Sequence, residues 1–278
     1  MLRSILVALD DTPGAQAARD AAVALARRTG AALTMAVVLD RPHTASDHEF
    51  VPVGGAAFKA RRDAKLTAQA EEEARQALEA AAAAAGDLRF DILRLEEAPE
   101  PALLRAGATH DLIVVGRDAT LGREQTEDDV APVIGELLMD GARPLLVVPP
   151  GAALRPEGPV LVGYDASLPA MAALQLFALL GLAEGSPVRV VSADADRDVA
   201  LRMAEQGAAY LARHGLSVTA HAITGGRPAD LLLAEADAMD ARLLVCGAFE
   251  NTGLTRLLTG SATRTLLRHA RLPLFIHH

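Results

Sequence analysis

Aromatic residues are scarce in this 278-residue chain, which contains no tryptophan and only 3% aromatic residues in total. Proteins that bind single-stranded nucleic acid stack the bases on aromatic side chains, and this composition argues against such a surface. The formal net charge of −9 also repels a phosphate backbone. We therefore expect no nucleic acid among the partners of this protein.

Cysteine is nearly absent as well, since Cys246 is the only one. A single cysteine forms no internal disulfide, which agrees with a reducing compartment, and we interpret Cys246 as a small buried strand residue. The N-terminal sequence MLRSILVALDD has an apolar run of only five residues before two aspartates. Neither a signal peptide nor a membrane span has this pattern. We predict a cytoplasmic protein that does not contact a membrane.

The chain does contain an internal repeat, carried by three apolar runs that recur in the same order. We interpret it as two copies of one unit, spanning residues 1–150 and 157–278 and joined by a linker rich in Pro and Gly. The matched runs are SILVALD at 4–10 with PVLVGYD at 159–165, DLIVVG at 111–116 with RLLVCG at 242–247, and RPLLVV at 143–148 with LPLFI at 272–276.

Each apolar run is short, β-branched and bounded by Asp, Gly or Pro, which is typical of a strand buried on both faces. Ala- and Leu-rich stretches of helical period separate the runs, and the longest extends from about Ala56 to Ala85. We interpret residues 61–85 as a solvated helical face with a stripe of alanines that faces a partner. The strict alternation of strand and helix predicts one doubly wound parallel sheet in each repeat.

Ligands of such sheets bind beyond the carboxyl ends of the strands, where the strand order reverses. In the second repeat, Gly247 ends a strand, and thirteen residues later Gly260-Ser261 opens a helix. Glycines let backbone N–H groups approach phosphate oxygens, and a helix N-terminus adds unpaired donors. Arg256 adds positive charge. Ser261 has an equally good explanation as an ordinary N-cap.

This arrangement resembles the universal stress protein family. In that family an aspartate follows the first strand, and the fourth strand is followed by Gly, two residues, Gly, nine residues and Gly-Ser/Thr. Asp165, Gly247, Gly260 and Ser261 match this pattern. The resemblance implies an α/β fold of two tandem flavodoxin-like (Rossmann-like) domains, each a five-stranded parallel sheet with helices on both faces. It also implies ATP or AMP binding, which many members show and others lack.

By this resemblance, the chain is a stress-response regulatory protein that binds ATP or AMP, with or without Mg²⁺, in its second repeat. Ribose and phosphates would be held by the residues after the fourth strand, and adenosine by Asp165 and the backbone near Ala193. We predict no dedicated enzyme beyond slow ATP hydrolysis, because no nucleophile elbow, HExxH or Walker A motif is present. The predicted nucleotide-binding residues are Gly163, Asp165, Ala193, Gly247, Arg256, Gly260, Ser261 and Ala262.

The sequence also departs from the family pattern. Glu250 replaces the second glycine, and its carboxylate would cost about 1–4 kcal/mol at 4 Å from a phosphate, unless it ligates a bridging divalent cation. In the first repeat, Ala131-Pro132 replaces Gly-Ser, and Glu127-Asp128-Asp129 precedes it. Proline has no N–H for a phosphate, so we predict no ATP binding there. Asp10 and Asp165 have an equally good explanation as structural or helix-capping residues.

Two alternative functions remain at this stage. A scaffold that binds no nucleotide would act through an unknown protein partner, as an intramolecular pseudo-dimer in which Leu145–Val148 pairs with Leu274–Ile276, and a homodimer of the whole chain is left open. A hydrolase or transferase is disfavoured, because the sequence shows no acid–base constellation and a fold alone does not give a function. One inserted loop has the residue types of a zinc site, although a polar surface loop explains it better. Its residues are His43, Asp47, His48 and Glu49.

Overall fold

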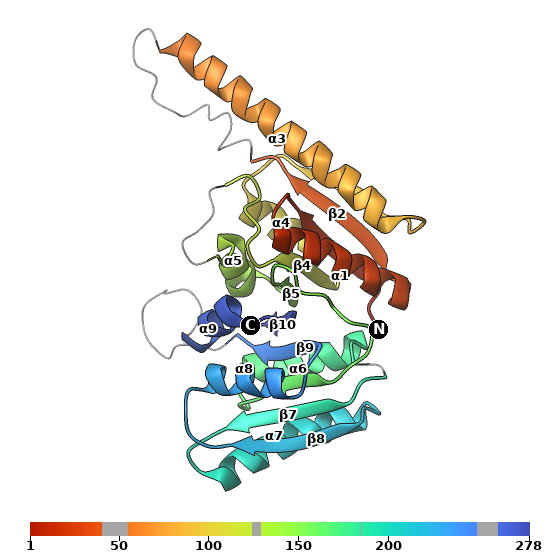
Figure 1. Cartoon of the computed structure of the whole chain (residues 1–278), viewed down its shortest axis with the longest axis vertical. Coiled ribbons are helices and arrows are strands. Elements are labelled where there is room, and N and C mark those ends of the chain that lie inside the picture. Colours follow the sequence, from red (N-terminus) through yellow and green to blue (C-terminus); the bar gives the residue numbers. More distant parts are fainter. Residues whose placement is uncertain (41–54, 124–128, 184, 249–260) are drawn as a thin grey trace.

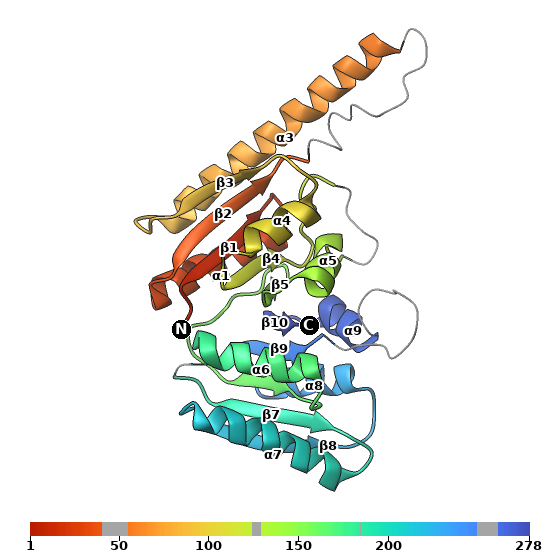
Figure 2. The same cartoon turned by 180° about the vertical axis from the view of Figure 1, so that it is seen from behind.

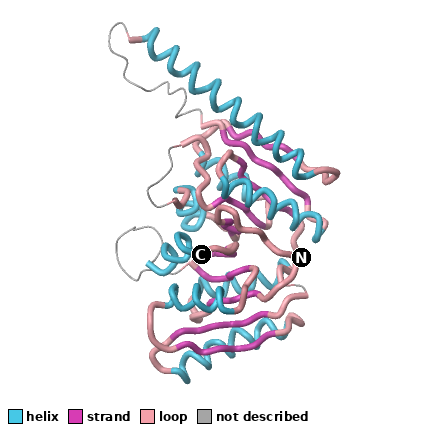
Figure 3. The backbone as a smooth tube through the Cα atoms, in the orientation of Figure 1, coloured by secondary structure: helices cyan, strands magenta, loops and turns pink. Residues whose placement is uncertain are grey.

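The computed structural model describes residues 1–40, 55–123, 129–183, 185–248 and 261–278. Within these residues, ten strands form one continuous sheet, and helices cover both of its faces (Figures 1 and 3). The strands are β1 (Ser4–Leu9), β2 (Ala32–Val38), β3 (Asp91–Leu95), β4 (Leu112–Gly116), β5 (Leu145–Val148), β6 (Val160–Gly163), β7 (Val188–Ala193), β8 (Val218–Ile223), β9 (Leu243–Gly247) and β10 (Leu274–His277). The helices are α1 (Pro13–Thr29), α3 (Ala56–Ala85), α4 (Pro99–Gly107), α5 (Pro132–Asp140), α6 (Leu168–Leu180), α7 (Arg197–Arg213), α8 (Pro228–Ala238) and α9 (Ser261–His269).

The strand order is β3-β2-β1-β4-β5-β10-β9-β6-β7-β8, so the second half of the sheet mirrors the first. Strands within each half are parallel. The two halves join where β5 and β10 pair antiparallel, with Phe275 opposite Leu146. We call the half formed by β1–β5 the first repeat and the half formed by β6–β10 the second repeat. The predicted pairing of the last strands within one chain is confirmed.

Two hydrophobic cores lie on opposite faces of the sheet, because successive strand residues point to opposite sides. Ile5, Val7 and Leu9 of β1 belong to the core on one face, whereas Leu6 and Ala8 belong to the core on the other. Helices α1, α3, α6 and α7 contribute to the first core, and α4, α5, α8 and α9 contribute to the second. Each core extends through both repeats, and both are built almost entirely from aliphatic side chains.

The first helix of each repeat begins and ends through local sequence signals. The hydroxyl of Thr12 accepts a hydrogen bond from the Ala15 N–H, and that of Ser167 accepts one from the Ala170 N–H. Both helices contain proline in their first turn, and Gly30 and Gly181 end them in the left-handed conformation. These caps place the N-terminus of each helix just beyond the carboxyl end of the first strand of its repeat.

The predicted fold class is confirmed, and the long helix has the predicted bounds, Ala56–Ala85. One part of the prediction needs refinement: the two five-stranded sheets are not separate layers but the halves of one sheet. Arg117, directly after β4, extends into the second repeat, where its Nη1 donates to the carbonyls of Arg268 and Ala270. None of the helices among the described residues has the length and apolarity needed to cross a membrane.

Candidate functional site

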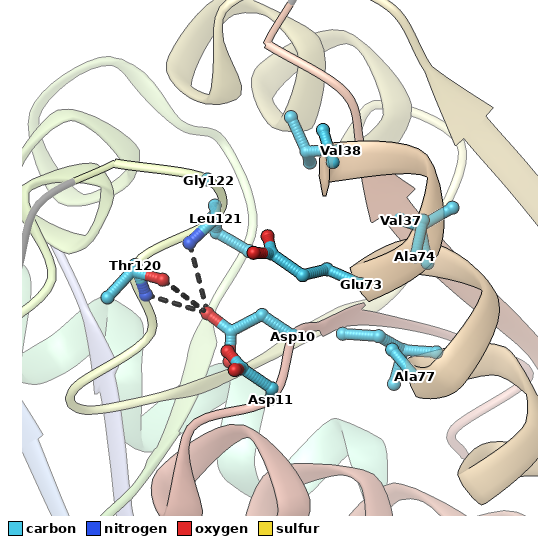
Figure 4. A pocket seen from close by; sticks show the side chains of 12 residues that line it. Asp10, Asp11, Val37, Val38, Glu73, Ala74, Ala77, Thr120, Leu121 and Gly122 are labelled. Carbon is cyan, nitrogen blue, oxygen red and sulfur yellow. Dashed lines mark hydrogen bonds between the residues drawn. The ribbon is translucent and has the colours of Figure 1, made fainter. Parts of the chain in front are cut away.

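The aspartate after the first strand has different surroundings in the two repeats. In the first repeat, Asp10 follows β1 and accepts hydrogen bonds at both carboxylate oxygens. Oδ1 accepts from the N–H and the hydroxyl of Thr12, at 2.9 and 2.7 Å. Oδ2 accepts from the backbone N–H groups of Thr120 and Leu121, at 2.7 and 3.0 Å. Asp10 therefore anchors the segment that follows β4 against the end of β1 (Figure 4).

The segment that Asp10 holds contains a buried residue with a strained backbone conformation. Leu121 has a φ of +50°, in the left-handed region that a branched side chain avoids, and only 2% of its surface is exposed. Arg123 fixes the same segment from the other side, because its guanidinium pairs with Asp40 at 3.0 Å and with Glu100 at 2.5 Å. Asp40 follows β2 and Glu100 lies in the first turn of α4. The segment Thr120–Arg123 is thus tied to β1, β2 and α4 at once.

The described residues at this edge of the first repeat line a small cavity. Its volume is about 30 Å³, which is room for a water molecule, whereas small-molecule sites usually measure about 300–1,000 Å³. The carboxylates of Asp10, Asp11 and Glu73 lie along it, and Figure 4 shows Glu73 reaching from α3 toward Leu121 and Asp10. Partial burial, together with Asp11 and Asp10, raises the pKa of Glu73 above its ordinary value. An anion would meet both a steric and an electrostatic barrier here.

In the second repeat, Asp165 occupies the corresponding position after β6. Its side chain is exposed, and its Oδ1 accepts a hydrogen bond from the Ser167 N–H at 3.0 Å, next to the N-terminus of α6. Ala166, between these two residues, has a φ of +58°. Asp165 therefore closes a turn at the helix start, as Asp10 does through Thr12. Its outer surface faces solvent at the carboxyl end of β6.

The other predicted residues of the second repeat have separate positions. Ala193 ends β7 and is half-buried, and Asp194 and Asp196 follow it, with the Asp194 Oδ1 accepting from the Asp196 N–H at 2.8 Å. These acidic neighbours were missed by the sequence analysis. Ala262 is half-buried against the core in the first turn of α9, which begins at Ser261. Three predicted or weighed residues, Glu250, Arg256 and Gly260, lie outside the described residues, as does the proposed zinc loop with His43, Asp47, His48 and Glu49.

Two of the predicted glycines have packing reasons that involve no ligand. A Cβ on Gly247 would lie 2.4 Å from the backbone nitrogen of Ala170, in the first turn of α6. Gly116, its counterpart in the first repeat, has the same relation to Ala15 of α1, at 2.3 Å. A Cβ on Gly163 would lie 2.7 Å from the side chain of Leu232 in α8. The glycine that ends the fourth strand lets the first helix approach the sheet in both repeats.

In the described part of the chain, the cysteine and the potential metal ligands form no further candidate site. Cys246 is buried in β9, and burial, with a smaller effect of Asp165, raises the pKa of its thiol. The structural prediction for this residue is confirmed. Among the described residues, no cluster of three or more His, Cys, Asp or Glu side chains has the geometry of a metal site.

Comparison with known proteins agrees with this architecture. A universal stress protein from Archaeoglobus fulgidus DSM 4304 superimposes with a TM-score of 0.67 and 18% sequence identity, over 99% of this chain and 95% of that one. A putative universal stress protein from Pseudomonas aeruginosa UCBPP-PA14 gives a TM-score of 0.58 and 20% identity, over 99% and 93% of the two chains. At these identities the likeness shows the fold. No curated protein is significantly similar to the sequence.

The family itself is shown by the sequence. A model of the universal stress protein family matches residues 1–126 and again residues 158–278. The two matches together cover most of the chain, and each includes the first strand and the aspartate that follows it. The chain therefore belongs to the universal stress protein family, with two family segments in tandem.

Proposed function

We propose that the second repeat binds an adenine nucleotide, ATP or AMP, and that the protein acts as a stress-response regulator and not as a dedicated enzyme. The observation that carries this proposal is the position of α9. It begins at Ser261, immediately after Gly260, as expected from the family's Gly-Ser/Thr motif. A helix N-terminus points its backbone N–H groups and the positive end of its dipole outward, and both favour phosphate.

The strand order also supports this position. Chain order reverses between β6 and β9, because β7 lies on the outer side of β6 whereas β10 lies beyond β9. Such a switch point is where doubly wound sheets bind their ligands. Asp165 follows β6 at this point with an exposed carboxylate, which can accept hydrogen bonds from ribose hydroxyls. In this proposal, the backbone near Ala193, at the end of the adjacent β7, contacts adenine.

The first repeat supports a single site for each chain. Its corresponding edge holds a cavity of about 30 Å³ beside three carboxylates. Its α5 begins at Pro132, whereas α9 begins at Ser261. Pro132 has no N–H to offer a phosphate. We therefore propose a stoichiometry of one nucleotide for each chain.

Calorimetric titration of the purified chain with ATP and with AMP, with and without Mg²⁺, tests the proposal. We expect a stoichiometry near one and at least a tenfold loss of affinity in Gly260→Asp, because the new carboxylate lies beside the phosphates. Asp165→Asn should weaken binding, whereas its matched control Asp10→Asn should leave the affinity unchanged. No binding by the unmodified chain would overturn the proposal, and a stoichiometry near two would show that the first repeat also binds.

A second candidate function, a scaffold without nucleotide, is favoured by one specific observation. The antiparallel pairing of β5 with β10 unites the repeats into one sheet inside a single chain, so their relative position requires no ligand. This candidate predicts that no nucleotide changes the melting temperature of the protein. The nucleotide proposal predicts that ATP or AMP raises it by mass action.

A further inference from the structure

Among the described residues, the N-terminal half of α3 is an arm in which no side chain is fully buried. The buried residues of this 30-residue helix are Ala74, Ala77, Ala81 and Ala85, all in its C-terminal half. Figures 1 and 2 show the other half extending beyond the edge of the sheet. Phe58, near the tip, is 74% exposed. We call residues 56–70 the arm; at 1.5 Å for each residue, it is about 22 Å long.

A helix of this length is marginally stable in water unless one face packs against something. The equivalent helix of the second repeat, α7, shows the contrast. It has 17 residues, and its buried residues extend from Ala200 to Leu211, so that packing supports almost its whole length. The arm exposes Phe58, and among the described residues none of its side chains is fully buried. The exposed face of the arm is therefore available to a partner.

The arm is basic, whereas the rest of the molecule is acidic. It contains Lys59, Arg61, Arg62 and Lys65 against a single acid, Asp63, which gives a net charge of +3. The chain as a whole carries −9, so the remainder carries −12. Both lysines of the chain lie in the arm. The C-terminal half of the same helix is acidic, with Glu71, Glu72, Glu73 and Glu79 against Arg75.

The two kinds of charge lie along one exposed line of the helix. Residues three and four positions apart share a helix face, and the members of this line are exposed on both the basic and the acidic halves. We call this line the outer seam; it contains Phe58, Arg61, Lys65, Ala68, Glu72 and Glu79. It lies on the side of α3 opposite the alanines that pack against the sheet.

We propose that the outer seam docks against the outer seam of a second copy of this chain, in an antiparallel pair. Antiparallel pairing around a twofold axis is self-complementary, because the basic half of each helix then faces the acidic half of the other. The midpoint between the basic residues 59–65 and the acidic residues 71–79 falls near Ala68. A small exposed residue at the crossing point lets the two helices approach closely.

This register makes definite pairs. Lys65 comes opposite Glu72 of the second copy, and Arg61 comes between Glu72 and Glu79 of the second copy. Phe58 comes opposite residues 78–79 of the second copy, and its ring packs over the adjacent exposed Ala80. Glu72 and Glu79 each already pair with Arg75 in their own helix. Each carboxylate has further oxygen lone pairs, so it accepts an additional cation without losing Arg75.

The first test is sedimentation of the full-length chain over a range of concentrations and salt. We expect a dimer that weakens as NaCl rises. Arg61→Glu with Lys65→Glu should give a monomer, and so should Glu72→Lys with Glu79→Lys. Mixing these two variants, or combining all four changes in one chain, should restore the dimer. Lys59 and Arg62 stay unchanged because they pair with Asp63.

A matched control changes the same charges on α7, where Arg202 and Arg213 are exposed. Arg202→Glu with Arg213→Glu should leave the dimer intact. A wild-type chain that stays monomeric at every concentration would overturn the proposal. A dimer that survives both arm reversals would place the interface elsewhere, which also overturns it. Binding of the monomeric arm to anionic lipid vesicles instead would identify a different occupant.

The second test measures the register directly, without relying on charge. Cys246 is buried, so an added exposed cysteine is the reactive one. Ala68→Cys should form a disulfide-linked dimer under mild oxidation, because the twofold axis brings the two copies of this residue together. Phe58→Cys on the same seam should not, since the two copies lie about 30 Å apart in an antiparallel pair. Cross-linking through residue 58 and not 68 would contradict the antiparallel arrangement.

Discussion

The two repeats share strand order, helix caps and the glycine that ends the fourth strand, yet they differ at the edge where ligands bind. Asp10 anchors Thr120 and Leu121 and helps close the first repeat over a cavity of about 30 Å³. Asp165, its counterpart, closes only the turn at the start of α6, and its side chain is exposed. The aspartate after the first strand thus has an additional structural role in the first repeat, where it holds the segment that follows β4.

The comparison shows that the same carboxylate can support the structure in one copy of a fold and stay exposed in the other. A carboxylate that meets no ligand must still have hydrogen-bond donors when it is partly buried. In the first repeat these donors come from the backbone of the segment after β4, and Arg123 adds ion pairs to Asp40 and Glu100. The closed edge therefore contributes to the rigidity of the repeat.

The largest expected effect concerns a feature that the two repeats share, the glycine at the end of the fourth strand. Gly116→Ala and Gly247→Ala should each destabilise the protein by about 3 kcal/mol, because the new Cβ would meet helix backbone at 2.3 and 2.4 Å. Urea unfolding followed by far-ultraviolet circular dichroism measures this, since the chain has no tryptophan. In Gly207→Ala, the new Cβ meets only side chains at 3.1 Å or more, so stability should stay within about 1 kcal/mol. A marked loss at Gly116 alone would show that Gly247 is not a packing glycine.

The next effect tests the difference between the repeats. Asp10→Asn should destabilise the protein by about 2 kcal/mol, because an amide group cannot accept from all the donors that surround Asp10. Asp165→Asn should cost less than about 0.5 kcal/mol, since its amide oxygen can still accept from the Ser167 N–H. The same urea titration, without nucleotide, compares the two. Equal losses would mean that Asp165 has structural partners as extensive as those of Asp10.

Much of the fold could be predicted because its signals are local. The β-branched runs bounded by Asp and Gly predicted the strands. The Ala-rich stretch of helical period between two of these runs predicted the long helix with its bounds, Ala56–Ala85. The pairing of Leu145–Val148 with Leu274–Ile276 was predicted from the family resemblance, since the last strands of that family pair across the dimer interface. The pairing of β5 with β10 is enough to join the two repeats into a single sheet.

The site was less predictable, because its decisive contacts join residues far apart in the sequence. Nothing in the residues around Asp10 shows that Thr120, 110 positions later, donates to it. Glu73 belongs to a helix interpreted as a solvated face, and only the packing of α3 beside β1 brings it to the cavity of the first repeat. Gly247 matches the family pattern and Gly163 was predicted beside Asp165, but a packing glycine and a phosphate-binding glycine look the same in a sequence. Their roles toward a ligand therefore stay predictions.

The smallest expected effect concerns the acidic cavity of the first repeat and its dependence on pH. Burial and the neighbouring Asp11 and Asp10 raise the pKa of Glu73 above its ordinary value of 4.5. The folded chain therefore holds this proton more tightly than the unfolded chain, and stability falls as pH rises from about 4 through the raised pKa. Glu73→Gln removes this loss, so it should stabilise the protein at pH 7 and not at pH 4. Because the side chain is partly exposed and water screens it, we expect less than about 0.5 kcal/mol.

Glu72→Gln is the matched control for this titration, since the adjacent carboxylate has the opposite shift. Arg75, and then Gln76, lower the pKa of Glu72 to about 2. Its ionised form is therefore favoured in the folded chain at all pH values above this, and neutralising it should give no gain at pH 7. Thermal unfolding of both variants from pH 4 to pH 7 separates the two carboxylates. If Glu73→Gln follows the wild type throughout, the carboxylates of the first repeat do not repel one another, and its closed edge is no barrier to an anion on electrostatic grounds.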